Sequence, residues 1–169
     1  VMERLSAQFG ASARVIRSTP ALLNALLETA DMVVGAVLIP GAAAPKLVSR
    51  TMLKDMQPGA VLVDVAIDQG GCFETSKATT HADPTYIIDD IVHYCVANMP
   101  GAVARTSTYA LNAATLVHAK RIARLGWKTA LSRDPHLLKG LNVCQGHLTY
   151  QAVGDALGIE TRAPQDMLS

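Results

Sequence analysis

The chain has 169 residues, half of them apolar, and its 15 Lys and Arg nearly balance its 14 Asp and Glu. This near-neutral charge gives no electrostatic case for binding nucleic acid or an acidic membrane surface. Only 4% of the residues are aromatic, which argues against a surface on which bases stack. No apolar run approaches the length that crosses a bilayer, so we expect one domain, or one plus an appendage, with no nucleic-acid or membrane partner.

The first 30 residues predict a helix, a strand and a second helix. Met2, Leu5 and Phe9 recur at helical spacing and Gly10 stops the pattern. Residues 13–17 are expected to form a short strand. Thr19 and Pro20 then predict a helix that runs to about residue 28, because a hydroxyl cap followed by proline is typical of a helix start.

The middle of the chain predicts a parallel sheet. Residues 32–38 and 60–66 are nearly continuous apolar runs, which are typical of parallel strands covered on both faces. Residues 85–88 and 92–96 are also strand-like, and a short helix capped by Ser49 is expected through residue 56. We predict that residues 32–38, 60–66 and 92–96 are neighbouring parallel strands, joined by right-handed crossovers.

From about residue 107 the pattern becomes helical. Apolar residues from Tyr109 to Leu125 favour one long helix that Gly126 closes, and two shorter helices are expected near residues 135–141 and 149–157. The tail after Gly158 is expected to be loose. The predicted fold is therefore α/β, a partial doubly wound, Rossmann-like parallel sheet with a C-terminal helical return segment.

The candidate site is Asp68, which follows the apolar strand at 60–66 and directly precedes Gln69, Gly70 and Gly71. Ligands of α/β proteins bind at the carboxyl ends of strands, and paired glycines let a backbone pass close to a ligand. Asp68 is thus a carboxylate at the mouth of a ligand crevice. The alternative is a tight turn in which Asp68 only bonds its own backbone.

The three cysteines are widely spaced, with neither the spacing of metal ligands nor a disulfide framework. We expect reduced thiols, no metal, no signal peptide and a cytoplasmic location.

Several motifs in order resemble the C-terminal part of a bacterial NAD-dependent alanine dehydrogenase. They are residues 35–41 (GAVLIPG), 45–48 (PKLV), 63–74 (VDVAIDQGGCFE), 93–101 (HYCVANMPG), 105–108 (RTST) and 139–142 (KGLN). Proton-translocating transhydrogenases share the Ile39-Pro40-Gly41 loop but resemble the chain less at residues 68–71.

The resemblance implies an oxidoreductase that reversibly deaminates L-alanine to pyruvate and ammonium with NAD and forms homo-oligomers, usually hexamers. It places residues 1–104 in the later part of a Rossmann NAD-binding domain and residues 105–169 in a helical return segment of the substrate domain. The alternatives are a relative of the transhydrogenase NAD-binding component, or a non-catalytic remnant of the same fold.

One departure from the family concerns cofactor binding. No G-x-G-x-x-G turn occurs in these 169 residues, although that turn holds the pyrophosphate of a dinucleotide. We therefore expect the chain to be part of a larger enzyme, to supply one side of the site, and to be inactive alone.

The resemblance also assigns residue roles. Asp68 is implied to be catalytic, assisting proton transfer during the imine and carbinolamine steps and contacting the nicotinamide ribose. The residues implied to bind the cofactor are Ser18, Val37, Leu38, Ile67, Asp68, Val96, Asn98 and Met99. Ordinary alternatives are packing for the aliphatic side chains, core filling for Met99 and a helix-start hydroxyl for Ser18.

Other polar residues are expected to be structural. Asp64 lies inside a strand and is expected to make structural hydrogen bonds. His93 is expected to be a satisfied structural imidazole, and Cys72 and Cys95 to be structural thiols. Lys46 is expected to be a solvated loop lysine.

Overall fold

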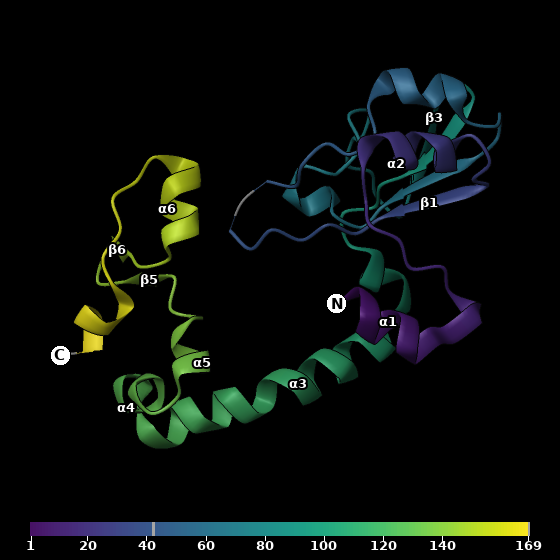
Figure 1. Cartoon of the computed structure of the whole chain (residues 1–169). Coiled ribbons are helices and arrows are strands. Elements are labelled where there is room, and N and C mark those ends of the chain that lie inside the picture. Colours follow the sequence, from purple (N-terminus) through teal and green to yellow (C-terminus); the bar gives the residue numbers. More distant parts are fainter. Residues whose placement is uncertain (42, 169) are drawn as a thin grey trace.

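The structure is a computed structural model that describes residues 1–41 and 43–168. Figure 1 shows an α/β part and a C-terminal part of short helices, joined by the long helix α3 (Ala104–Leu125). None of the helices in the described ranges has both the length and the apolar character of a membrane-crossing segment.

The α/β part is built on a four-stranded sheet. Its strands are β1 (Met32–Gly35), β2 (Val61–Asp64), β3 (Thr85–Ile88) and β4 (Ile91–Tyr94), in the spatial order β1-β2-β4-β3. The pairs β1–β2 and β2–β4 are parallel, which confirms the predicted neighbours. The strands end before residues 38, 66 and 96: the chain leaves the sheet after β1 and β2 to form two loops, and after β4 Val96 forms an isolated bridge with Thr79.

The strand β3 runs antiparallel to β4, a direction that the sequence analysis left unstated. A turn at Asp89 and Asp90 joins the two strands, and both residues have positive φ, 51° and 62°. Two consecutive residues with positive φ match the right-handed twist of a tight hairpin. The two-residue connection is also too short for a parallel crossover.

One face of the sheet is packed and the other is open. Helix α2 (Pro20–Leu27) and the 3₁₀ helix η2 (Arg50–Asp55) contribute Leu27 and Leu53 to the core beneath Leu62. On the opposite face, Met32, Val34 and Ile87 are 60%, 57% and 67% exposed. The prediction of strands covered on both faces thus holds for only one face within the described residues.

The N-terminal segment differs from the prediction in one respect. Helix α1 (Met2–Phe9) is followed by the 3₁₀ helix η1 (Gly10–Ser12), and Thr19 caps α2 by accepting a hydrogen bond from the Leu22 amide. The predicted strand at residues 13–17 is wrong, because no neighbouring strand among the described residues supplies it with backbone partners.

The C-terminal part folds back on itself after α3. It contains α4 (Trp127–Ser132), α5 (Pro135–Leu138), the hairpin β5 (Val143–Cys144) and β6 (His147–Leu148), α6 (Gln151–Leu157) and η5 (Pro164–Leu168). The prediction of a loose tail is wrong: Thr161 pairs with Leu148 and Met167 is buried. Gly126 closes α3 as predicted, and an ion pair between Arg121 and Asp134 ties α3 to the start of α5.

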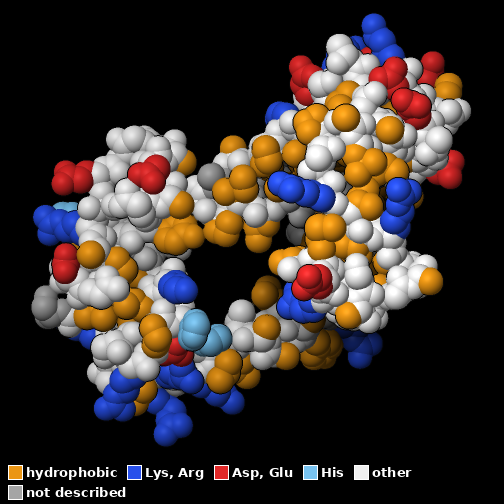
Figure 2. Space-filling view, in the orientation of Figure 1, with side chains coloured by type: hydrophobic (Ala, Val, Ile, Leu, Met, Phe, Trp, Pro, Cys, Tyr) orange, Lys and Arg blue, Asp and Glu red, His pale blue; other side chains and the backbone are white. Residues whose placement is uncertain are grey.

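The two parts meet again through the loop after β1. A side-chain carbon built at Gly41 would lie 2.8 Å from Tyr150 Cε1 and 2.9 Å from the Cβ of Ala152, so the α6 region touches this loop. Figure 2 shows the resulting ring around a central opening, with hydrophobic side chains on its rim. The glycine permits this approach because any side chain would collide with α6.

We expect the isolated chain to self-associate through the open face of the sheet, because contiguous exposed apolar surface is costly in water. The double variant Val34→Lys, Ile87→Lys places charges on that face without touching the core. Light scattering should therefore report a smaller particle for the variant than for the parent chain. A parent chain that is monomeric at the same concentration would contradict this expectation.

Candidate active site

The loops that follow β1 and β2 enclose the candidate site. Both strands end at the same edge of the sheet, and the amide of Val65 donates to the carbonyl of Gly35 at 2.8 Å just beyond them. A hollow of about 260 Å³ lies between the two loops. It is lined by Ala36, Val37, Leu38, Val65, Ala66, Asp68 and Gln69.

Asp68 occupies the centre of a 3₁₀ turn, η3 (Ile67–Gln69), and its side chain is exposed. Gly70 and Gly71 follow with φ of 89° and 75°, a conformation that side-chain-bearing residues rarely adopt. A carbon added to Gly71 would also lie 2.7 Å from Asp64 Oδ2. The backbone conformation therefore favours glycine at both positions, and Gly71 is also needed for the approach to Asp64.

Asp64 holds the loop that carries Asp68. The side chain is fully buried, and its carboxylate accepts hydrogen bonds from the amides of Ala66, Cys72 and Phe73 at 3.1, 2.9 and 3.4 Å. The hydroxyl of Ser76 donates to the same carboxylate. The prediction that Asp64 makes structural hydrogen bonds is confirmed, and its partners lie on both sides of the Asp68 turn.

Lys46 contacts this turn from the other side. Its Nζ donates to the carbonyl oxygens of Gly70 at 2.5 Å and Gly71 at 2.8 Å. Lys46 is exposed on a loop, as expected, but its ammonium also binds this turn, which the expectation of a solvated side chain did not include. Nothing in the sequence near Lys46 indicates these acceptors, because they lie 24 and 25 residues further along the chain.

Backbone hydrogen bonds align the two loops around these side chains. The amide of Ala44 donates to the Gln69 carbonyl at 3.0 Å, and that of Leu47 to the Cys72 carbonyl at 2.7 Å. Beyond them, Val48 forms an isolated parallel bridge with Phe73. The loops thus support each other although neither belongs to the sheet.

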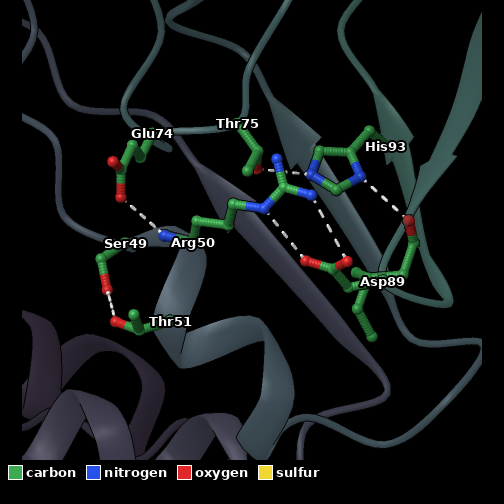
Figure 3. Close-up of polar contacts among 8 residues, drawn as sticks. Ser49, Arg50, Thr51, Glu74, Thr75, Asp89 and His93 are labelled. Atoms are coloured by element: carbon green, nitrogen blue, oxygen red, sulfur yellow. Dashed lines mark hydrogen bonds and ion pairs between the residues drawn. The ribbon is translucent and has the colours of Figure 1, made fainter.

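The far end of the Asp68 loop is fixed by the polar contacts in Figure 3. The amide of Arg50 donates to Glu74 Oε2 at 2.7 Å, and the guanidinium of Arg50 pairs with Asp89 at 3.3 Å. Thr75 bonds to His93 Nε2 at 2.7 Å. These contacts connect the loop to η2 and to β4.

His93 is a satisfied structural imidazole, as predicted. Its Nδ1 lies 2.9 Å from the Ile91 carbonyl, so Nδ1 carries the proton and Nε2 accepts from the Thr75 hydroxyl. Burial lowers the pKa of His93. Burial and the neighbouring Asp64 carboxylate raise the pKa of the Cys72 thiol to about 11, in keeping with a structural role.

A second hollow, of about 550 Å³, lies between the Asp68 turn and α6. Its lining residues are Gly41, Ala43, Asp68, Gln69, Gly70 and Ala156. The side-chain oxygen of Gln69 is buried and meets no hydrogen-bond donor within the described part of the chain. Because a buried acceptor without a donor is costly, this oxygen is a place where a ligand group could donate.

The remaining predicted site residues line neither hollow. Ile67, the first residue of η3, and Val96, just after β4, are buried. Asn98 is exposed, and its carbonyl lies 2.6 Å from His81 Nε2, while Met99 begins the 3₁₀ helix η4 (Met99–Val103). Ser18 is exposed just before the cap of α2. Of the predicted residues, the structure brings together only Val37, Leu38 and Asp68 in one hollow.

No group of three or more His, Cys, Asp or Glu among the described residues is arranged to hold a metal ion. Cys72, Cys95 and Cys144 are free and buried.

Replacing Asp64 by Asn should destabilise the chain by about 3 kcal/mol, because an amide nitrogen would face buried amides and leave donors unpaired. Urea unfolding at matched protein concentration measures the change. Asp83→Asn, at an exposed aspartate, is the control and should shift stability by no more than about 0.5 kcal/mol. Equal stability of the two variants would contradict the role given to Asp64.

The chain should lose stability as the pH falls below about 6.5, the ordinary pKa of histidine. In that range the unfolded chain binds a proton at His93 that the folded chain, with its lowered pKa, does not bind. Urea midpoints between pH 7 and 5 should therefore fall more steeply for the parent than for His93→Gln. Parallel slopes would show that His93 does not contribute.

The comparisons with known proteins agree on one family. The family described as "Alanine dehydrogenase/PNT, C-terminal domain" matches residues 1–151. The alanine dehydrogenase of Halomonas elongata is 58% identical over 159 residues, and that of Lysinibacillus sphaericus 52% identical over 159 residues. Each alignment covers 94% of this chain but 43% of the relative, so the chain spans less than half the length of these curated relatives.

Solved structures give the same result. An L-alanine dehydrogenase superposes with a TM-score of 0.80 at 43% identity, covering 93% of this chain and 43% of that one. A transhydrogenase from Sinorhizobium meliloti superposes less well, with a TM-score of 0.57 at 32% identity over 68% of this chain and 33% of that one. The chain belongs to the alanine dehydrogenase/PNT C-terminal domain family.

Proposed function

We propose that this chain forms the cofactor-binding side of an NAD-dependent alanine dehydrogenase, which converts L-alanine, NAD and water into pyruvate, ammonium, NADH and a proton. The observation that carries the proposal is Asp68, presented on a braced turn between two hollows at the carboxyl edge of a parallel sheet. The closer similarity to alanine dehydrogenases than to the transhydrogenase favours this activity.

The residues present fit one side of a nicotinamide nucleotide. The hollow between the loops is mostly aliphatic, which suits a flat ring, and the buried oxygen of Gln69 could accept a hydrogen bond from an amide or hydroxyl. We assign the backbone of Val37 and Leu38 to the ribose, and the segment from Val96 to Met99 to the nicotinamide side. Ile67 supports the pocket from below, and Ser18 lies toward the adenine end.

When bound, the nicotinamide supplies the acceptor for the electron pair that leaves the alanine Cα. Asp68 has a different task in this proposal: its exposed carboxylate accepts and returns protons as water adds to the substrate imine and ammonia leaves. The braced backbone on both sides of Asp68 keeps the carboxylate near the reacting carbon, where correct placement contributes to the rate.

The rest of the chain has supporting roles in the proposal. Residues 1–104 form the later part of the NAD-binding domain, and residues 105–169 return toward the substrate domain, so that α6 closes the second hollow. The whole enzyme is a cytoplasmic homo-oligomer with alanine and pyruvate as its substrates, in line with the three free thiols.

A grafted enzyme tests the proposal. In it, this chain replaces the matching 159-residue segment of the Halomonas elongata alanine dehydrogenase. We expect alanine-dependent formation of NADH by the grafted enzyme and none by the isolated chain, which has no G-x-G-x-x-G turn. A folded graft that binds NADH but does not oxidise alanine would contradict the proposal.

In the grafted enzyme, Asp68→Asn should lower kcat about 100-fold or more and change the Kd for NADH less than about threefold. The substitution keeps the side-chain size but removes the proton acceptor, and an interaction needed only for reaction appears in kcat. Asp83→Asn is the matched control. Weakened NADH binding with normal kcat would reduce Asp68 to a ribose contact, and normal turnover would leave it a turn residue.

A further inference from the structure

Lys46 makes an unusual pair of contacts for a side chain on an exposed loop. Its ammonium donates to the carbonyls of two consecutive residues, Gly70 and Gly71. Both glycines have positive φ, a conformation that side-chain-bearing residues rarely adopt. Hydrogen bonds from a charged donor are shorter and stronger than those between neutral groups, so the two contacts restrain the backbone directly after Asp68.

The same turn is held from its other side by a charge of opposite sign. The Asp64 carboxylate accepts the amides of Ala66 and Cys72, which come before and after the turn. Backbone amides on either side of the turn thus donate to the Asp64 carboxylate, and the carbonyls of Gly70 and Gly71 accept from the Lys46 ammonium. Asp68 projects from the middle of this arrangement, so its carboxylate is placed by the backbone that carries it.

The contacts of Lys46 are better suited to placing the turn than to stabilising the fold. Lys46 is exposed, and its loop is already held by the backbone bonds of Ala44 and Leu47. Without the ammonium, Gly70 and Gly71 keep only the bonds inside the turn, from their amides to the carbonyls of Ile67 and Ala66. Glycines have wide conformational freedom, so this part of the turn would sample other arrangements.

We propose that Lys46 is a positioning residue, which acts through Gly70 and Gly71 to hold the Asp68 carboxylate at the hollow where the reaction takes place. This inference rests on the proposed function, because it gives Lys46 a role only if Asp68 acts in the reaction. A misplacement of about 1 Å at a reacting group can cost about 100-fold in rate, so the contribution is measurable.

The test compares Lys46→Met and Lys46→Arg in the grafted enzyme. Methionine keeps the aliphatic stem and removes the charge, so we expect kcat to fall roughly 10- to 100-fold while the KM for NAD and the urea midpoint change little. Arginine retains donors that can reach two carbonyls, and it should recover most of kcat. Lys54→Met, at an exposed lysine of η2, is the matched control and should retain normal kcat.

A double-mutant cycle with Asp68→Asn separates positioning from general stability. If Lys46 acts through Asp68, Lys46→Met should lower kcat less than about twofold once Asp68 is already Asn. Hydrogen exchange provides a readout without turnover: Lys46→Met should speed exchange of the amides at residues 69–72, whereas Lys54→Met should not.

The outcomes distinguish the two proposals. Normal turnover in Asp68→Asn would overturn the role of Asp68, and that of Lys46 with it. A large loss in Asp68→Asn with normal kcat in Lys46→Met would overturn the Lys46 inference alone. So would an equal effect of Lys46→Met in both backgrounds, or a Lys46→Met protein that fails to fold while Lys46→Arg folds, since either result assigns Lys46 to stability.

Discussion

The buried carboxylate of Asp64 is the constraint on which the candidate site depends. A buried charge is tolerated only when it is well hydrogen-bonded, and here most of its partners are backbone amides of the following loop. The loop must therefore come back against the end of β2. That return requires a residue without a side chain at Gly71, and it brings Cys72 against Gly35, where an added carbon would lie 2.1 Å from the Cys72 sulfur.

Once the loop is folded back, the position of Asp68 is set by the chain on both sides of it. The Asp64 carboxylate fixes Ala66 and Cys72, so the short turn between them can only point outward. The loop after β1 then pairs with this turn through Ala44 and Leu47. The site thus lies on irregular backbone that is as well restrained as a strand, which is what precise placement of a reacting group demands.

Much of the fold could be predicted from local patterns. The apolar runs at β1, β2 and β4 are separated by segments long enough for crossovers, which predicts parallel neighbours. The same argument gives the direction of β3: only residues 89–91 separate the expected strands at 85–88 and 92–96, too few for a parallel crossover, so an antiparallel pair is required. The strand expected at residues 13–17 failed because a strand exists only where a neighbour pairs with it, and local spacing does not show whether one does.

The residues of the candidate site also differ in whether local sequence predicts their role. Asp68 could be predicted because a strand end, a carboxylate and two glycines stand together within a few residues. The contacts of Lys46 could not, because they depend on two loops about 25 residues apart coming together in the folded chain. An exposed lysine is ordinarily solvated, and its sequence neighbours here suggest nothing else. The Gly71 carbonyl faces Lys46 because the amide of the same trans peptide unit, that of Cys72, points the opposite way and donates to Asp64. Residues that place a reacting group are therefore found from the fold of the loops, after the reacting group itself has been found from the sequence.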